Sequence, residues 1–201
     1  MEVLHCEPGF VVCVKPVGVG SEEGENTLPA MLRKLIGGEI YPVHRLDLNV
    51  GGVIVYARTR QAAAALSKSV QEGTMVKEYR ALVHGTPPEN GTWEDLLFKD
   101  SRKNKVFVVD RQRKGVKSAK LDFQTLVPGE ESYVHIRLHT GRSHQIRVQF
   151  SSRGFPLVGD HKYGARDKAT APCLWSYRIT FPHPKTGKPM QFIAPDPNFV
   201  P

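Results

Sequence analysis

The hydrophobic positions along the chain follow two periods, and each period predicts a different kind of element. Short apolar runs and alternating apolar and polar positions, bounded by glycine or proline, are typical of β-strands. The clearest alternation lies in residues 133–139, where Val134, Ile136 and Leu138 share one face. On this basis we expect strands at 10–15, 53–59, 77–84, 96–98, 106–109, 121–127, 133–139, 175–181 and 191–194.

Three segments have the spacing of amphipathic helices instead. Residues 28–36 and 60–72 each follow a threonine that is placed to cap a helix, and each ends at a glycine. Residues 143–154 form the third segment, in which Ile146 and Phe150 share a face. Many strands with three interspersed helices predict an α+β fold with a mixed, mostly antiparallel sheet. We expect a single domain over residues 1–201, and the loop at 85–92 is the best candidate for a boundary.

The composition indicates a globular protein that works in water. Of the 201 residues 40% are hydrophobic, and no apolar run approaches the roughly 18 residues that a membrane helix needs. The N-terminus lacks the basic start and apolar stretch of a signal peptide. The three scattered cysteines form no Cys-x-x-Cys pair, which argues against a disulfide or zinc framework. We therefore expect a cytoplasmic monomer with reduced thiols and no membrane contact.

Positive charge changes this picture because it is concentrated in one segment. The chain carries a net charge of +8, and residues 99–120 hold nine lysines or arginines against two aspartates, a net charge of +7. An apolar stretch at 106–109 divides the segment, which predicts a basic hairpin. Such a hairpin could follow a nucleic-acid backbone, with Lys103 and Lys105 as phosphate contacts. The alternative is a solvated loop whose lysines only protect an edge strand from aggregation.

The stretch VHRLDLNVGG at 43–52 places a carboxylate, Asp47, among apolar neighbours. An ionised carboxylate is costly to bury unless a cation pairs with it. The candidate cations are Arg45, on the same side of an extended segment, and the distant Arg147. A catalytic carboxylate would fit this pattern, and so would a structural ion pair or an aspartate that caps a turn.

A second cluster, LHTGRSHQIRVQF, spans residues 138–150. A strand that ends in Thr-Gly and enters a helix leaves backbone N–H groups free for an anion. Arg142 and Arg147 are then placed to bind an anion or a carboxylate. His144 would share a helix face with Arg147 and is a further candidate for substrate binding. A metal site built from His135, His139 and His144 is less convincing because a break from strand to helix separates them and no acidic residue is near.

A third feature is Tyr79 in the predicted strand KEYRALVH. A tyrosine in a strand most often packs in the core or at an edge. A functional tyrosine at this position would stack on a base or move a proton.

Four segments in register resemble the RluA family of pseudouridine synthases. The family's opening strand ends in a Lys-Pro-x-Gly turn, as FVVCVKPVGV does, and its H-R-L-D-x-x-T-S-G segment resembles VHRLDLNVGG. Its K-x-Y-x-A-x-V-x-G strand resembles KEYRALVHG. Its T-G-R-x-H-Q-I-R-x-H segment, followed by G-D-x-x-Y-G, resembles TGRSHQIRVQF followed by GDHKYG. The likeness spans about residues 9–195.

The resemblance implies a fold, an activity and site residues. The family fold is an α+β catalytic domain with a long mixed sheet flanked by helices and a central cleft. The family isomerises uridine to pseudouridine in ribosomal or transfer RNA without a cofactor or metal. By this resemblance Asp47 is the catalytic aspartate and Arg147 the basic residue that pairs with it. Tyr79 packs on the everted base, Arg45 enters the stack where that base leaves, and Ile146 lines the pocket.

The chain departs from the family pattern at a few positions. Val50-Gly51 stands where the family has Thr-Ser, and Gln149 replaces the histidine after Q-I-R-x. Because the motifs begin by about residue 10, we expect no separate N-terminal RNA-binding domain. The basic segment at 99–120 then becomes the candidate for holding substrate. Two other classes stay open at this point: a noncatalytic RNA-binding or ribosome-assembly factor, and a metal-dependent hydrolase that uses the histidines.

Overall fold

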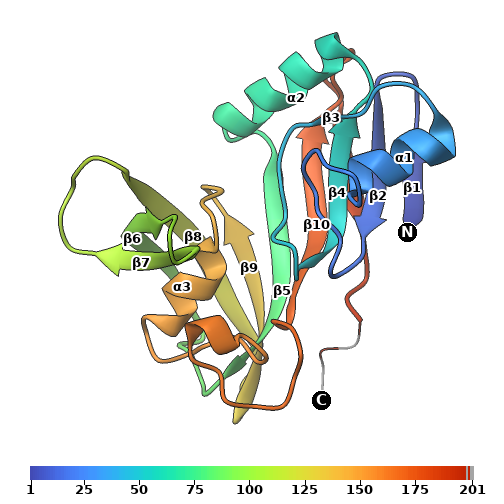
Figure 1. The fold of residues 1–201 in the computed structure, drawn as a ribbon. Coiled ribbons are helices and arrows are strands. Elements are labelled where there is room, and N and C mark those ends of the chain that lie inside the picture. Colours follow the sequence, from blue (N-terminus) through green and yellow to red (C-terminus); the bar gives the residue numbers. More distant parts are fainter. Residues whose placement is uncertain (198, 200–201) are drawn as a thin grey trace. The chain divides into compact units, whose positions relative to one another are not determined.

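A computed structural model of the chain describes residues 1–197 and 199, and it divides into two compact units. The first unit comprises residues 1–77 and 175–196, and the second comprises residues 78–174 together with residues 197 and 199. The chain passes between them within a strand, β5 (Val76–His84), and again at residues 174–175, so neither crossing lies in the loop at 85–92. Each unit is built on β-strands with helices on their faces, which confirms the predicted α+β fold (Figure 1).

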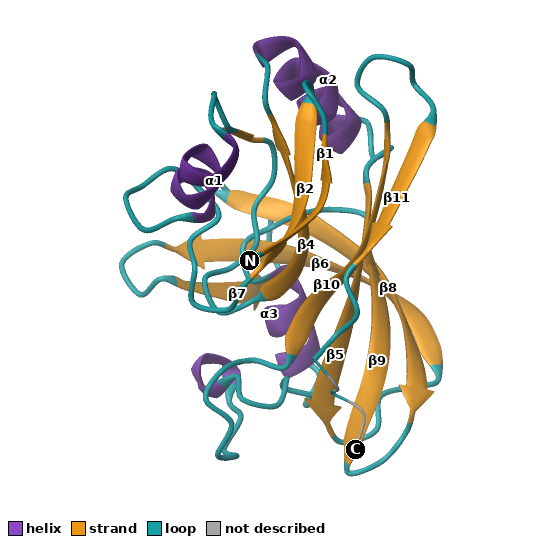
Figure 2. Cartoon of the chain, turned by 90° about the vertical axis from the view of Figure 1, so that its right-hand side faces the viewer, coloured by secondary structure: helices purple, strands orange, loops and turns teal. Residues whose placement is uncertain are grey.

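The first unit contains six strands of a mixed sheet. β2 (Phe10–Lys15) lies antiparallel between β1 (Glu2–Cys6) and β4 (Gly51–Ala57), and the short β3 (Tyr41–Pro42) also pairs with β4. β10 (Leu174–Pro182) runs parallel to β4 and forms a hairpin with β11 (Pro189–Ile193), as Figure 2 shows. The sequence did not predict β1 or β3, whose short runs have little apolar periodicity.

Two helices of the first unit match their predicted segments. α1 (Leu28–Ile36) has proline in its first turn and ends at Gly37, which has a φ of 67°. In α2 (Arg60–Gln71) the Thr59 hydroxyl accepts the N–H of Ala62 at 3.1 Å, as expected for an N-cap. Ala62 and Leu66 of α2 pack with strand residues of the same unit in one hydrophobic core. Those strand residues are Phe10, Val12, Val53, Val55, Ala57, Ile179 and Phe181.

The second unit is a sheet in which β6 (Asn90–Asp100), β7 (Lys105–Val109), β8 (Val116–Val127) and β9 (Glu131–Leu138) pair antiparallel, with one helix on its face. Its strands follow the order β5-β9-β8-β6-β7. The helix α3 (Gln145–Ser151) lies across β6, β7 and β8 (Figure 1). Val148 of α3 packs there against Leu97, Val106 and Ala119. β7 is the terminal strand in this order, so one of its edges is left to side chains and solvent.

Among the described residues, no helix combines the length and the apolar character required to cross a bilayer. The three cysteines are all free thiols.

Candidate active site

The loop that carries Asp47 joins β3 to β4 in the first unit. Buried Ser21 clamps the residue before Asp47, because its Oγ donates to the Leu46 carbonyl at 2.8 Å and accepts the Leu46 N–H at 3.1 Å. The carbonyl of Asp47 accepts the N–H of Val50 at 3.0 Å, which closes a tight turn. The backbone on both sides of the half-buried carboxylate is therefore fixed.

Lys15, at the end of β2, holds the other side of this loop. Its side chain is fully buried, and Nζ donates to the carbonyl oxygens of Pro16, Val19 and Leu48 at 2.9, 2.6 and 3.1 Å. An ammonium group has three donors, so all of them are satisfied. Burial lowers the pKa of Lys15 to about 8, and the negative charge of Asp47 opposes that shift. Lys15 therefore fixes the backbone of the loop that carries Asp47, here called the aspartate loop, and places a positive charge in it.

His44 anchors the start of the loop to β4. Its Nε2 accepts the backbone N–H of Val55 at 3.3 Å, and Nδ1 is buried without a hydrogen-bond partner among the described residues. Burial, aided by the charge of Lys77, lowers the pKa of His44 to about 3. The imidazole is therefore neutral at physiological pH and acts as a structural acceptor.

The two glycines that end the loop are required by close backbone packing. A Cβ on Gly51 would lie 2.3 Å from the Trp175 ring, and a Cβ on Gly52 would lie 2.2 Å from the carbonyl oxygen of Ser176. Gly52 also has a φ of 113°, which side-chain-bearing residues rarely adopt. Both glycines pair with β10 in parallel register, so they fix the distance between the end of the aspartate loop and that strand.

The apolar surroundings expected for Asp47 are only partly present. Leu46 and Val50 are buried, but Leu48 is 57% exposed. Arg45 is also exposed, and its guanidinium pairs with Glu22 at 2.6 Å rather than lying in the interior. An exposed arginine with a weak surface partner can reach a ligand at little cost, because such pairs contribute only about 0–1 kcal/mol.

Arg147 lies on α3 in the second unit and is held by a carboxylate of the same unit. Its Nε and Nη2 donate to the two oxygens of Asp160 at 2.7 and 2.8 Å. Arg147 is 7% exposed and Asp160 is 1% exposed. Two parallel charge-assisted hydrogen bonds in a buried setting fix the plane of the guanidinium.

Tyr163 completes the surroundings of Arg147. Its ring centroid lies 5.1 Å from Cζ of Arg147, a cation–π distance. Its hydroxyl lies 2.8 Å from Nδ1 of His144, the residue that precedes α3. The structure therefore brings His144 and Arg147 together around Tyr163. Ile146, between them in sequence, is 4% exposed, and Tyr79 on β5 is 5% exposed.

At the start of α3, where the sequence predicts an anion site, a side chain of the turn binds one of the backbone N–H groups. The helix begins at Gln145 rather than at residue 143, and Oε1 of Gln145 accepts the N–H of Arg142 at 3.0 Å and the hydroxyl of Thr140 at 2.8 Å. The Arg142 side chain donates from Nε to the Ser118 carbonyl at 2.8 Å. The Gln145 side chain thus binds the Arg142 N–H, one of the donors that the sequence pattern left for a ligand.

The three histidines of the alternative metal site have separate partners. His135 lies 3.1 Å from Glu78, His139 lies 2.6 Å from Asp122, and His144 contacts Tyr163. Within the part of the chain that the structure describes, no group of three or more potential ligands could hold a metal ion. The side chains therefore give the metal-dependent hydrolase no support.

The basic segment at 99–120 forms the predicted hairpin, since β6 and β7 pair from Leu96–Val109 to Asp100–Lys105. Lys103 is exposed in the turn of this hairpin. Lys105 starts β7, and its Nζ lies 5.2 Å from the ring centroid of Tyr163. The hairpin is thus packed against the residues that surround Arg147.

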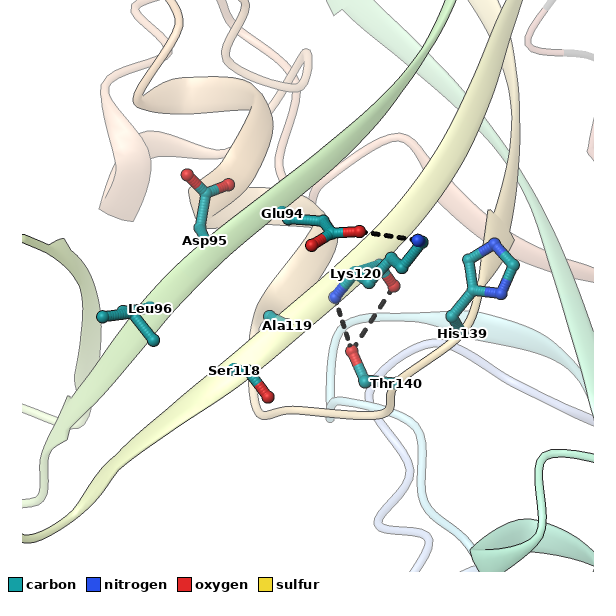
Figure 3. A pocket seen from close by; sticks show the side chains of 8 residues that line it. All are labelled: Glu94, Asp95, Leu96, Ser118, Ala119, Lys120, His139 and Thr140. Atoms are coloured by element: carbon teal, nitrogen blue, oxygen red, sulfur yellow. Dashed lines mark hydrogen bonds and ion pairs between the residues drawn. The ribbon is translucent and has the colours of Figure 1, made fainter. Parts of the chain in front are cut away.

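A pocket of about 410 Å³ lies beside the start of α3 and is shown in Figure 3. Its lining consists of Glu94, Asp95, Leu96, Ser118, Ala119, Lys120, His139 and Thr140. The charges in it are compensated, because Lys120 pairs with Glu94 at 2.6 Å and Asp95 pairs with Arg153 at 2.9 Å. Since none of the predicted site residues lines it, this pocket does not identify the site.

Comparison with known proteins places these observations in a family. Residues 9–152 match the family model for RNA pseudouridylate synthase. The chain belongs to the RNA pseudouridylate synthase family. This result confirms the resemblance that the four sequence segments predicted.

Curated relatives in this family include an uncharacterized RNA pseudouridine synthase of Chloroflexus aurantiacus, which is 38% identical over 81% of this chain and 52% of the relative. A ribosomal large subunit pseudouridine synthase D of Zymomonas mobilis is 33% identical over 98% of this chain and 69% of the relative. The chain spans about half the length of several of these relatives.

A solved structure of the same family agrees with the fold. Human RNA pseudouridylate synthase domain containing 1 superposes with a TM-score of 0.83 at 25% identity, covering 98% of this chain and 83% of that chain.

Sequence reasoning found the motifs of this family but missed the residues that hold them in place. Lys15 belongs to the quoted Lys-Pro-x-Gly turn, while Asp160 and Tyr163 belong to the quoted segment GDHKYG. Their membership in these motifs was the only feature of the sequence that could have marked them as functional. Nothing in spacing alone connected Asp160 to Arg147, which lies 13 residues away.

Substitution of Asp160 tests the buried pair. Because Asp160→Asn leaves a buried guanidinium without its counter-charge, we expect the free energy of unfolding to fall by about 3 kcal/mol. The matched control is Glu23→Gln, which breaks the bidentate but exposed pair of Glu23 with Arg33 and should cost less than about 1 kcal/mol. Urea denaturation followed by circular dichroism compares the two. Equal losses would contradict the importance of burial.

The pH dependence of stability tests His44. In the folded protein its pKa is about 3, well below the ordinary value of 6.5, so the unfolded chain binds a proton that the folded chain excludes. Stability should therefore be lost as pH falls from about 6.5 toward 3. Between pH 6.5 and 5 the loss from this residue is about 2 kcal/mol. Comparing wild type with His44→Gln isolates it, and parallel pH curves for the two proteins would show that the imidazole is not buried neutral.

Proposed function

We propose that this protein is an RNA pseudouridine synthase, an isomerase that converts uridine to pseudouridine within RNA without a cofactor. The observation that carries the proposal is membership of the family, together with the presence of Arg45, Asp47, Tyr79 and Arg147 at its motif positions. We further propose that residues 1–201 act as one catalytic domain and that the protein is a cytoplasmic monomer.

The reaction rearranges one bond. The bond from ribose C1′ to N1 of uracil breaks, C1′ joins C5 of the same uracil, C5 loses a proton and N1 gains one. The mass of the RNA is unchanged. The base must leave its stack before this can happen, at a cost of a few kcal/mol.

Asp47 is the proposed catalytic group. Its carboxylate could attack the sugar, attack the ring or remove a sugar proton, and each route needs an ionised carboxylate in a fixed position. The hydrogen bonds that hold Leu46 and Leu48 supply the fixed position, and the buried Lys15 places its ammonium group in the same loop.

The remaining roles follow from the family motifs and from local geometry. Tyr79 is proposed to stack on the everted base, and Arg45 to fill the space that the base leaves. Arg147 is proposed as the basic partner of the catalytic carboxylate. The side chain of Arg147 has its Nε and Nη2 committed to Asp160, so its orientation is set before substrate arrives. Ile146, Arg142 and His144, on or beside α3, are proposed to line the substrate site.

We propose ribosomal RNA as the substrate class, because several relatives are named ribosomal large subunit pseudouridine synthases. Incubation of the protein with separated ribosomal and transfer RNA, followed by carbodiimide treatment and mapping of reverse-transcription stops, tests both the activity and this choice. Stops confined to transfer RNA would overturn the substrate class. RNA binding without any new stop would favour a noncatalytic RNA-binding or assembly factor.

The Asp47→Asn variant tests the catalytic assignment. We expect it to abolish pseudouridine formation while its affinity for RNA stays within about tenfold of wild type, because affinity rests mainly on phosphate contacts. The control is Asn49→Ala, an exposed change two residues away in the same loop. Product formation by Asp47→Asn at the wild-type rate would exclude Asp47 as the reacting group.

The Lys103→Ala/Lys105→Ala variant tests the hairpin as a phosphate contact. Removing two cations should weaken RNA binding and reduce the slope of log K against log salt by about 1.5. The matched control is Lys185→Ala/Lys188→Ala, which removes two exposed lysines from the turn between β10 and β11. A salt slope that both double variants reduce equally would mean that only net charge matters.

A further inference from the structure

Tyr163 is held in a buried position by contacts to both its backbone and its ring. It ends the 3₁₀ turn His161–Tyr163 and is 5% exposed. Its backbone carbonyl accepts the hydroxyl of Ser151 at the end of α3. Its side chain belongs to the hydrophobic core that joins α3 to β6, β7 and β8. Tyr163 is thus fixed at both its backbone and its ring.

The hydroxyl of Tyr163 connects the basic hairpin to the start of α3. It accepts the backbone N–H of Val106 at 2.8 Å, and β7, where Val106 lies, is the terminal strand in its order. The same oxygen is hydrogen-bonded to Nδ1 of His144, 2.8 Å away. One hydroxyl therefore satisfies an edge-strand donor and orients an imidazole.

His144 needs such a restraint. Its φ of 51° is in the left-handed region, one of two such non-glycine residues among those described. Residues in that region persist only where surrounding contacts hold them. The hydrogen bond between His144 and the Tyr163 hydroxyl is a contact of this kind, and it restrains the backbone of the residue that precedes α3.

The ring of Tyr163 carries two cations. Cζ of Arg147 lies 5.1 Å from its centroid, and Nζ of Lys105 lies 5.2 Å from it. Lys162, the preceding residue, donates from Nζ to the Asn104 carbonyl in the hairpin turn at 3.1 Å. The same short turn therefore contacts the proposed phosphate-binding hairpin and the proposed catalytic partner.

We propose that Tyr163 is a positioning residue that sets the basic hairpin and Arg147 in fixed relation, so that RNA held by the hairpin is aligned with the catalytic helix. Its hydroxyl fixes the hairpin through Val106, and its ring fixes the guanidinium that Asp160 orients. This inference rests on the proposed function, because it takes RNA as the ligand of the hairpin and Arg147 as a participant in turnover.

The two parts of the side chain can be removed separately. Tyr163→Phe keeps the ring but deletes the hydroxyl, so the N–H of Val106 loses its partner and the hairpin loosens. We expect KM and Kd for RNA to rise about fivefold, the effect of one net hydrogen bond, with kcat within twofold. Tyr163→Leu also deletes the ring beside Arg147. We expect it to show the same rise in KM and, in addition, a fall in kcat of at least tenfold.

The matched control is Tyr133→Phe on β9, a tyrosine of the same unit whose ring contacts Arg80. It should leave kcat and KM unchanged. Denaturation midpoints of all variants are measured alongside. Loss of stability with unchanged kcat and KM would overturn the proposal and leave Tyr163 a structural residue. A tenfold loss of kcat in Tyr163→Phe without any rise in KM would overturn the division between hydroxyl and ring.

Binding data separate this inference from the activity. If wild type forms no pseudouridine but Tyr163→Phe still weakens RNA binding about fivefold, the isomerase assignment and the link to turnover both fail, while the contact between hydroxyl and hairpin stands. If wild type forms pseudouridine and Tyr163→Phe binds RNA as wild type does, the isomerase assignment stands and the inference fails.

Discussion

The buried pair of Arg147 and Asp160 is the interaction on which the arrangement of the proposed site residues within the second unit depends. A lone guanidinium in this position would be strongly unfavourable, and Asp160 compensates it with two short hydrogen bonds in a plane. Such a pair contributes little net stability compared with apolar residues, but its geometry is specific. Around it the chain arranges Tyr163, His144 and the edge of β7. The buried ion pair thus adds little net stability, but it fixes the orientation of the Arg147 guanidinium.

The aspartate loop in the first unit follows the same principle with different groups. Lys15 is buried with all of its donors bound to backbone carbonyls, and His44 is buried as a neutral acceptor. Lys15 and His44 can influence the proposed site without contacting a substrate. They fix the peptide groups around Asp47, as Gly51 and Gly52 do by allowing β10 to approach. In both units, residues next to the proposed reacting groups are held by buried polar contacts, which is how a site gains precision without relying on mobile loops.

Local sequence pattern predicted most of the elements because the information for them is local. The alternation in 133–139 and the threonine cap before residue 60 each depend on neighbours a few positions away, and both features form. Two errors have physical reasons. β1 has mostly half-buried residues, so its apolar pattern is weak. The start of α3 shifted because the left-handed backbone of His144 and the side chain of Gln145 end the preceding turn, a choice that propensity does not encode.

For the proposed site, the sequence could predict only those residues that belong to the family motifs. Asp47, Tyr79 and Arg147 were proposed from a family resemblance, and the family match confirms that resemblance. The residues that hold them in place are visible only in the tertiary contacts of the structure. Asp160 and Tyr163 illustrate the difference, since both lie in a recognised motif but the sequence does not show which residues they contact. A contact such as Val106 N–H to the Tyr163 hydroxyl joins residues 57 positions apart, so neither periodicity nor composition carries any trace of it. Catalytic groups tend to lie in recognisable strings, but the residues that align them are chosen by the fold, and only the folded chain shows which they are.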